Sequence, residues 1–212
     1  MENLKLDNLE VTTLGWQYSQ WQDTFYPDDL PEEWRLDFYL NHFRLAAVPQ
    51  HVWLAWLLED GLDEEPFDDF VDCLNENTLL LLIVAEEQLA HLEKLLELTQ
   101  GSDFAERLIG CAVLAETLLP PSEIRGLPVT LVSSRLTFPG WSWRNDGIVV
   151  SGQPMAWIND LPQDGKQQAD LLKDLVSSIP QQDSAVPVCV ANPEMSISSV
   201  QNLKTVAELL GY

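Results

Sequence analysis

The sequence predicts an α/β protein, in which the strands of a mostly parallel sheet alternate with amphipathic helices. The clearest strand is residues 78–85, an almost unbroken apolar run of the kind that parallel sheets bury on both faces. An amphipathic helical pattern follows over residues 86–98, and a second apolar run, residues 186–191, also precedes a helical pattern. The chain has 212 residues, 46% of them hydrophobic, which is enough for a substantial core. We therefore expect residues 1–212 to form a single domain.

The other elements follow from local signals. Residues 11–14 are β-branched and apolar, which favours a first strand, and Pro31 with the two acids after it suits the start of a helix. The expected elements are, in chain order, a strand at 11–14, a helix at 31–43, a strand at 45–48, helical segments at 50–59 and 66–75, a strand at 78–85, a helix at 86–98, strands at 108–114, 128–132 and 186–191, and a helix at 199–210. Residues 148–150 and 155–158 form either a hairpin or two neighbouring strands.

Aromatic residues gather directly after the first expected strand. Gly15, Trp16, Tyr18 and Trp21 are followed by Phe25, Tyr26 and Pro27. Aromatic side chains combine a large contact area with a polar tip, so a cluster at the end of a strand indicates either the wall of a pocket or a hydrophobic lid.

This pattern, Gly-Trp-x-Tyr-x-x-Trp-x-x-x-Phe-Tyr-Pro, with Leu36, Tyr39 and Phe43 at helical spacing behind it, resembles the N-terminal signature of the YecE-like family, domain-of-unknown-function family number 72. Residues 186–192 resemble the last strand of that family. The resemblance covers residues 11–43 and 186–210 and implies a (β/α)8 barrel with its site at the carboxyl ends of the strands. Because such barrels typically have about 250 residues, we expect a reduced or divergent TIM-like barrel.

The chain departs from the family pattern at two places. The family usually has a strand with Glu and Asn after the first helix, whereas this chain has Leu45 to Pro49, and it usually has Arg and His late in the chain, whereas residues 147–152 contain neither. If those polar residues carry the chemistry of the family, this chain has lost it.

The net charge of -23, from 34 acidic and 11 basic residues, limits the partners. An acidic surface repels phosphate backbones and anionic membranes, and the arginines are scattered, so neither a nucleic acid nor a membrane is expected as a partner. A small molecule or a protein remains possible as a partner, and solubility alone also explains the charge. Residues 1–7 lack the pattern of a signal peptide, and Cys73, Cys111 and Cys189 suit free thiols, so we expect a cytoplasmic protein.

Catalytic and metal-binding motifs are weak. His42, His51 and His91 have no zinc-ligand spacing, and the acidic residues between Asp60 and Asp72 lack the ligand order of an EF-hand. No phosphate-binding loop, dinucleotide fingerprint or nucleophile elbow is present in the sequence. We therefore expect no metal and no cofactor.

The candidate ligand-binding residues are aromatic, with one amide. In a closed barrel the first and last strands are neighbours, so the residues after both should meet at one face. We predict a pocket lined by Trp16, Tyr18, Trp21 and Asn192. Trp141 and Trp143, two apart beside Arg144, are candidates to cover it, either as a ligand clamp or as part of a plug that leaves no cavity.

Two classes of function remain open from the sequence. The first is a non-catalytic binding or regulatory protein that kept an aromatic pocket and lost its polar residues. The second is a hydrolase-type enzyme that uses carboxylates at the barrel mouth, such as Asp23. The missing late Arg and His favour the first.

Overall fold

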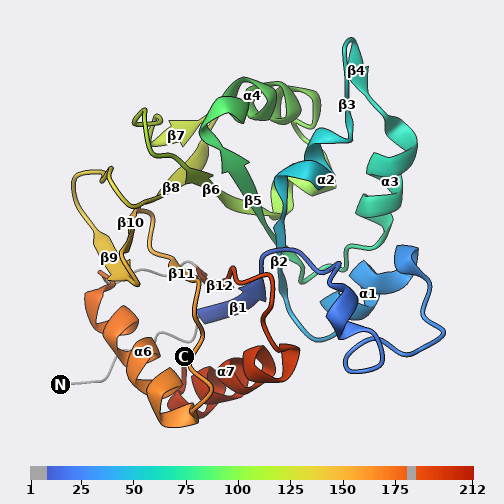
Figure 1. Ribbon diagram of the computed structural model, residues 1–212. Helices are drawn as coiled ribbons and strands as arrows, with labels where there is room; N and C mark the ends of the chain where they lie inside the picture. Colours follow the sequence, from blue (N-terminus) through green and yellow to red (C-terminus); the bar gives the residue numbers. More distant parts are fainter. Residues whose placement is uncertain (1–8, 181–184) are drawn as a thin grey trace.

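The computed structural model describes residues 9–180 and 185–212, in which strands and helices alternate along an α/β chain (Figure 1). The strands are β1 (Leu9–Thr13), β2 (Leu45–Val48), β3 (Leu57–Leu58), β4 (Gly61–Leu62), β5 (Leu79–Ala85), β6 (Leu108–Leu114), β7 (Glu123–Ile124), β8 (Leu127–Ser133), β9 (Ser142–Asn145), β10 (Ile148–Gly152), β11 (Ala156–Ile158) and β12 (Val186–Val190). The helices and 3-10 turns are η1 (Ser19–Trp21), η2 (Glu32–Trp34), α1 (Arg35–Leu40), α2 (Gln50–Leu54), α3 (Glu64–Asp72), η3 (Glu86–Gln88), α4 (Leu89–Leu98), α5 (Asp103–Arg107), α6 (Gly165–Ser178) and α7 (Ile197–Leu210). Residues 1–7, on which we based the expectation of no signal peptide, lie outside the described part.

Two sheets carry the fold. The smaller sheet has the order β1-β12-β11 and is parallel throughout. The larger sheet begins with the parallel strands β2, β5, β6 and β8 and ends with β10 and β9, which run antiparallel to their neighbours. Val11 pairs with Val188, so the prediction that the first and last strands are adjacent is confirmed.

The ladders of these sheets do not close into a barrel. β1 and β2 are joined by a single parallel bridge between Leu14 and Ala47, next to which the N–H of Gly15 donates to the carbonyl of Ala47 at 3.0 Å. At the other ends, no ladder joins β10 to β11 within the described residues. The expectation that residues 78–84 share one sheet with the first and last strands is wrong, because β5 lies in the larger sheet and β1 and β12 lie in the smaller one. The fold is therefore α/β with parallel sheets.

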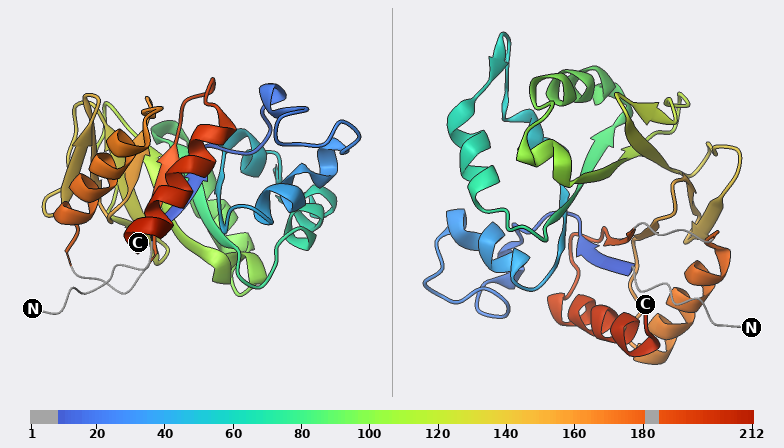
Figure 2. Two further views of the ribbon diagram at one scale, coloured as in Figure 1. Left: turned by 90° about the horizontal axis from the view of Figure 1, so that it is seen from below. Right: turned by 180° about the vertical axis from the view of Figure 1, so that it is seen from behind.

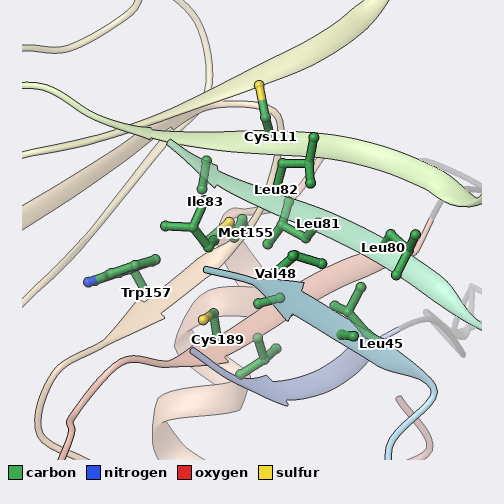
Figure 3. Packing of buried hydrophobic residues seen from close by; sticks show 14 of the residues in the cluster. Leu45, Val48, Leu80, Leu81, Leu82, Ile83, Cys111, Met155, Trp157 and Cys189 are labelled. Atoms are coloured by element: carbon green, nitrogen blue, oxygen red, sulfur yellow. The ribbon is translucent and has the colours of Figure 1, made fainter. Parts of the chain in front are cut away.

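The two sheets nevertheless share one hydrophobic core. Figure 3 shows Leu81 and Ile83 of β5 lying near Met155, Trp157 of β11 and Cys189 of β12. On the outside, α6 and α7 pack side by side, and α7 contacts β1 (Figures 1 and 2). Burial of Leu and Ile side chains stabilises such a core by about 1.5–3 kcal/mol per fully buried side chain.

The junction between β1 and β2 is held by side chains as well as by its single bridge. The fully buried Tyr39 of α1 accepts the N–H of Thr13 at 3.0 Å, and its hydroxyl lies 3.0 Å from Thr12 Oγ1. Thr12 donates its own hydroxyl to the carbonyl of Leu45 at 2.8 Å. Because Thr12 has one hydroxyl hydrogen, this bond makes Tyr39 the donor to Thr12. Burial raises the pKa of Tyr39 to about 12, which keeps the donating proton in place.

A second set of side chains links the carboxyl ends of the larger sheet. Gln50, after β2, accepts the N–H of Ala85 at the end of β5 at 2.9 Å. Glu86, after β5, accepts the N–H groups of residues 116–118 after β6, at 3.1 to 3.3 Å. Glu116, after β6, accepts the N–H of Ser134 after β8 at 2.8 Å. We call these three links the edge ladder. In each link, a side chain that follows one strand accepts a hydrogen bond from a backbone N–H at the end of the next strand in the sheet.

Several expected elements differ from the structure. The prediction of a helical segment at 50–59 is wrong for the second half of that range. Helix α2 ends at Leu54, and Leu57 to Leu62 form the small β3-β4 hairpin. Gly61, with φ of 159° in extended backbone, starts β4, and Lys94 stabilises the turn by donating to the carbonyls of Leu58 and Glu59 at 2.6 Å each.

Residues 148–150 and 155–158, for which either a hairpin or two neighbouring strands was expected, form separate strands in different sheets. β10 pairs with β9 and β8, whereas β11 pairs with β12, so residues 148–150 and 155–158 do not form a hairpin with each other. The hairpin present is β9-β10, whose two-residue turn, Asp146 and Gly147, has φ of 47° and 79°. These values suit a type I′ turn, for which Asp-Gly is a favoured sequence.

Replacing Tyr39 by Phe tests the junction between β1 and β2. We expect the free energy of unfolding to fall by about 1–3 kcal/mol, because the N–H of Thr13 is left buried without an acceptor. Tyr39→Phe and Thr12→Val should be non-additive in urea unfolding, since the two hydroxyls bond each other. Thr130→Val removes a distant buried hydroxyl that donates to the carbonyl of Gln153, and it should add independently to Tyr39→Phe.

Acid titration tests the edge ladder. Hydrogen bonds from Thr117 hold the pKa of Glu86 below its usual value near 4.5, and those from Ser134 do the same for Glu116. A lowered folded pKa contributes stability that is present above the unfolded pKa and is lost as the pH falls through the folded pKa. Glu86→Gln should therefore lower the free energy of unfolding at neutral pH and weaken its dependence on pH below about 4.5. Glu87→Gln, which removes a charge beside the ladder, should retain the wild-type pH dependence of this step; an unchanged profile in Glu86→Gln would contradict the assignment.

Candidate functional site

The site begins where β1 ends. Gly15 turns the chain with φ of +80°, a left-handed conformation that suits glycine. It also lies against Pro49, because a Cβ added at Gly15 would come within 2.7 Å of Pro49 Cγ. Gly15 follows β1 and Pro49 follows β2. The ends of these two strands therefore approach each other so closely that a side chain at Gly15 would collide with Pro49.

Most of the aromatic residues after Gly15 form a packed base. Trp21 is buried and lies parallel to Tyr39, with ring centroids 6.4 Å apart and an interplanar angle of 4°. Its indole N–H donates to the carbonyl of Met195 at 3.4 Å, which joins the loop after β1 to the loop after β12. Phe25 packs edge-on against Phe38 at 5.3 Å. Trp21 and Phe25 therefore pack into the hydrophobic core and do not form the wall of a pocket.

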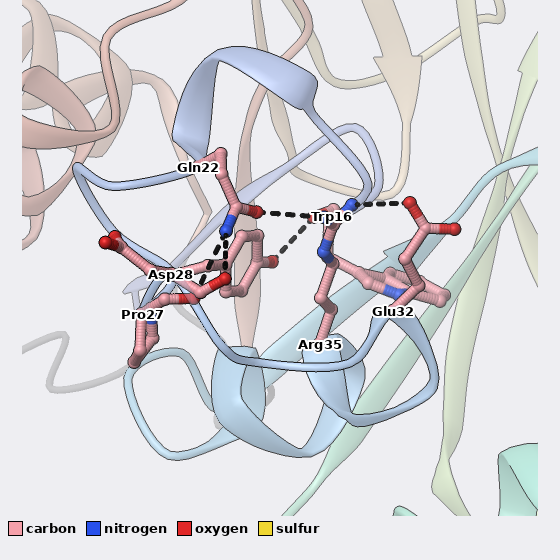
Figure 4. Close-up of polar contacts among 7 residues, drawn as sticks. Trp16, Gln22, Pro27, Asp28, Glu32 and Arg35 are labelled. Carbon is pink, nitrogen blue, oxygen red and sulfur yellow. Dashed lines mark hydrogen bonds and ion pairs between the residues drawn. The ribbon is translucent and has the colours of Figure 1, made fainter.

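Arg35 fixes the far side of this loop (Figure 4). Its guanidinium lies 5.4 Å from the ring centroid of Tyr26, donates to Gln22 Oε1 at 3.0 Å and pairs with Glu32 at 3.4 Å. The hydroxyl of Tyr26 donates to the carbonyl of Trp16 at 2.6 Å. Through these contacts α1 and η2 hold the backbone of Trp16 in place. Arg35 Nε has no hydrogen-bond partner among the described residues, and the Tyr26 ring face offers partial compensation for its charge.

Above this base the structure contains a cavity of about 370 Å³. It lies at the carboxyl ends of β1, β2 and β12, where ligands bind in open parallel sheets. Its volume falls within the range of small-molecule sites. The lining residues are Leu14, Gly15, Trp16, Gln17, Tyr18, Pro49, His51, Val52, Ala191 and Pro193. Gly15 and Trp16 are buried and form the floor, whereas Gln17, His51 and Pro193 are exposed and form the rim.

The cavity includes part of the predicted set. Trp16 and Tyr18 line it, whereas Trp21 lies in the packed base. Asn192 lies in the expected loop, between the lining residues Ala191 and Pro193, but it lines a smaller neighbouring cavity. Its side-chain oxygen accepts the N–H of Glu194 at 2.9 Å, so it stabilises a turn.

Trp141 and Trp143 lie elsewhere and do not line this cavity. Trp143 is buried, and its indole N–H donates to Asp174 of α6 at 2.8 Å, while that of Trp141 donates to Ser178 of the same helix at 3.3 Å. Both therefore anchor β9 to α6, and the geometry does not support their expected role as a cover.

The lining residues that the candidate set lacks include Gln17, Pro49, His51 and Val52. Pro49 follows β2, so its position at the end of a parallel strand was a usable signal. His51 was assigned to a helix, and α2 does place it on the rim of the cavity. Nothing in the sequence separates a rim histidine from an ordinary solvated one.

The lining of the cavity contains no carboxylate, ammonium or guanidinium group. None of its lining residues is Asp, Glu, Lys or Arg, in a protein whose net charge is -23. The hydroxyl of Tyr18 donates to the carbonyl of Leu14, and burial raises its pKa well above the usual value, so the phenol stays protonated. The walls thus offer apolar surface, a neutral phenol, one amide and one imidazole.

The carboxylates invoked for a hydrolase lie outside the cavity. Asp23 is exposed and has a positive φ of 62°, in the turn closed by its N–H bond to the carbonyl of Tyr26 at 3.0 Å. It hydrogen-bonds Asp28, and this bond raises the pKa of the Asp28 carboxyl. A pair of acids at this turn faces solvent, away from the cavity lining.

No group of three or more His, Cys, Asp or Glu residues within the described chain is arranged to hold a metal ion. Across the same residues, no helix combines the length and the apolar character needed to cross a bilayer.

Comparisons with known proteins gave no relatives: no protein-family model, no curated protein and no solved structure matched the chain. The resemblance to the YecE-like family therefore stays a prediction.

Gly15→Ala tests the floor of the cavity. We expect a loss of about 1–2 kcal/mol from the left-handed backbone and a further loss of about 1–3 kcal/mol from the contact with Pro49, measured by urea unfolding. Gly101→Ala is the matched control, because Gly101 has nearly the same φ, +78°, with nothing within 4 Å of an added Cβ. Equal losses in the two variants would show that the approach of Gly15 to Pro49 does not constrain the fold.

Proposed function

We propose that this chain is a non-catalytic small-molecule-binding protein whose ligand occupies the cavity at the carboxyl ends of β1, β2 and β12. The observation that carries the proposal is the placement of this cavity, which is lined by Trp16 and Tyr18 and has a volume of about 370 Å³. Small-molecule sites are typically concave, mostly apolar and largely preformed.

The absence of paired catalytic groups in the lining supports binding over turnover. General acid–base catalysis needs a titratable group within hydrogen-bond reach of the reacting atom, and hydrolases commonly pair two such groups. Here His51 on the rim is the group available, with the protonated phenol of Tyr18. Asp23, the residue of the hydrolase alternative, does not line the cavity.

We also propose that the fold is a reduced or divergent TIM-like barrel. The parallel order of β2, β5, β6 and β8, the pairing of β1 with β12 and the single bridge from β1 to β2 all support it. A site at the carboxyl ends of the strands is where such barrels bind ligands. A lack of affinity for nucleic acids and membranes also belongs to the proposal, because the net charge is -23. The proposal further includes a cytoplasmic location, which the free thiols Cys73, Cys111 and Cys189 suit.

A fragment screen by protein NMR, with a variant that fills the cavity, tests the proposal. Ala191 lines the cavity and is half-buried, so Ala191→Trp should occupy part of the space. We expect a set of small apolar fragments to shift wild-type resonances of Trp16 and Tyr18 and to lose at least tenfold in affinity for Ala191→Trp. Each bound fragment should be recovered chemically unchanged by mass spectrometry.

The matched control is Ala90→Trp, which adds the same side chain at an exposed position of α4. It should retain wild-type affinities. Fragments that bind Ala191→Trp as tightly as wild type would place the site elsewhere, and conversion of a bound ester or glycoside would favour the hydrolase.

A further inference from the structure

The cavity has a chemical character that restricts its ligand. Its floor and walls are apolar or aromatic, from Leu14, Trp16, Val52, Ala191 and Pro49, and its polar groups, Gln17 and His51, are at the rim. These two rim groups come from different elements, the loop after β1 and helix α2.

We propose that the ligand is an uncharged, largely apolar compound with the bulk of two fused rings and one amide-like polar group directed at the rim. This inference rests on the proposed function and specifies the class of ligand.

The neutrality follows from the lining. A charged group taken out of water needs a counter-charge or a full set of hydrogen bonds, and unpaired buried charge costs several kcal/mol. The lining contains no Lys or Arg for an anion and no Asp or Glu for a cation. The acidic residues elsewhere on the surface do not replace a direct partner, because salt screens exposed charges over roughly 8–10 Å. They do act against anions at long range.

The size follows from the volume. An apolar cavity of about 150 Å³ encloses a benzene molecule, and the cavity here, at about 370 Å³, is more than twice as large. Two fused rings with a small substituent therefore fill the space, whereas a single ring leaves much of the apolar wall without contact. Unfilled wall loses its dispersion contacts, which favours the larger ligand.

The amide-like group follows from the rim. The Gln17 side chain has both an N–H₂ donor and a carbonyl acceptor, and the imidazole ring of His51 adds two nitrogens that can take part in hydrogen bonds. A ligand group that both donates and accepts, as a carboxamide does, can satisfy both residues. A purely apolar ligand would leave the rim groups to water, without a directional contact.

Three nearly isosteric probes separate the effects of charge: naphthamide, which is neutral, naphthoate, an anion, and naphthamidine, a cation. Their dissociation constants are measured by titration calorimetry with the full chain. We expect naphthamide to bind at least tenfold more tightly than either charged probe and to bind at least tenfold less tightly to Ala191→Trp.

A charge inserted at the rim gives a second measurement. Gln17→Glu should raise the affinity for naphthamidine by about threefold, the effect of an exposed ion pair, lower that for naphthoate and leave naphthamide within about twofold. Gln167→Glu, on the exposed surface of α6, adds the same charge away from the cavity and should change none of the three.

The outcomes distinguish this inference from the function beneath it. Naphthoate or naphthamidine binding as tightly as naphthamide would overturn the neutral ligand and leave a binding protein. If fragments bind in the cavity but none of the three probes does, the two-ring amide class is wrong. Unchanged affinities in Gln17→Glu would refute the contact with Gln17. If neither fragments nor probes respond to Ala191→Trp, the binding function itself fails.

Discussion

The structure depends on how β1 and β2 are held together. These strands belong to different sheets and share a single bridge between Leu14 and Ala47. Along this seam, Tyr39 of α1 accepts the N–H of Thr13 and bonds the hydroxyl of Thr12, which in turn donates to the carbonyl of Leu45. A side-chain hydroxyl here replaces ladder bonds, and it does so without water because the site is buried.

The same seam determines where the cavity forms. Gly15 and Pro49, the residues after the two strands, meet closely, while the first residues beyond them diverge into the aromatic loop and α2. The space between loop and helix is the cavity. A fully paired ladder would continue the sheet through this region, so the short pairing of β1 with β2 and the presence of a site have a common origin.

The sequence predicts the long buried strands well, because continuous apolar runs such as β5 and β12 have few other solutions. It predicts short elements poorly. The two residues of β3 or β7 give no periodicity, and helix α6 was not identified in the sequence. The Asp146-Gly147 pair is a sequence signal for the β9-β10 hairpin, because Asp-Gly favours a two-residue type I′ turn.

For the site, the sequence identified the correct loop but not the directions of its side chains. Trp16 and Tyr18 face the cavity, while Trp21 turns inward to stack on Tyr39. Asn192 shows the same limit, since its two neighbours line the cavity and its own amide closes a turn. Side-chain direction in a loop depends on tertiary partners such as Met195, which no local pattern shows.

The edge ladder has a consequence for motion. Its hydrogen bonds join the segments after β2, β5, β6 and β8, each to the next along the sheet. A shift of one of these segments therefore strains its bond to the neighbouring one. The loops after β1 and β12 are instead joined to each other, by Gln20 donating to the carbonyl of Pro193 at 2.6 Å. One side of the cavity rim, on α2, is thus bonded to the end of β5 in the larger sheet, whereas the other side consists of the loops after β1 and β12, which are bonded to each other. A shift of the loop after β12 would therefore be transmitted to the loop after β1 through the bonds made by Gln20 and Trp21.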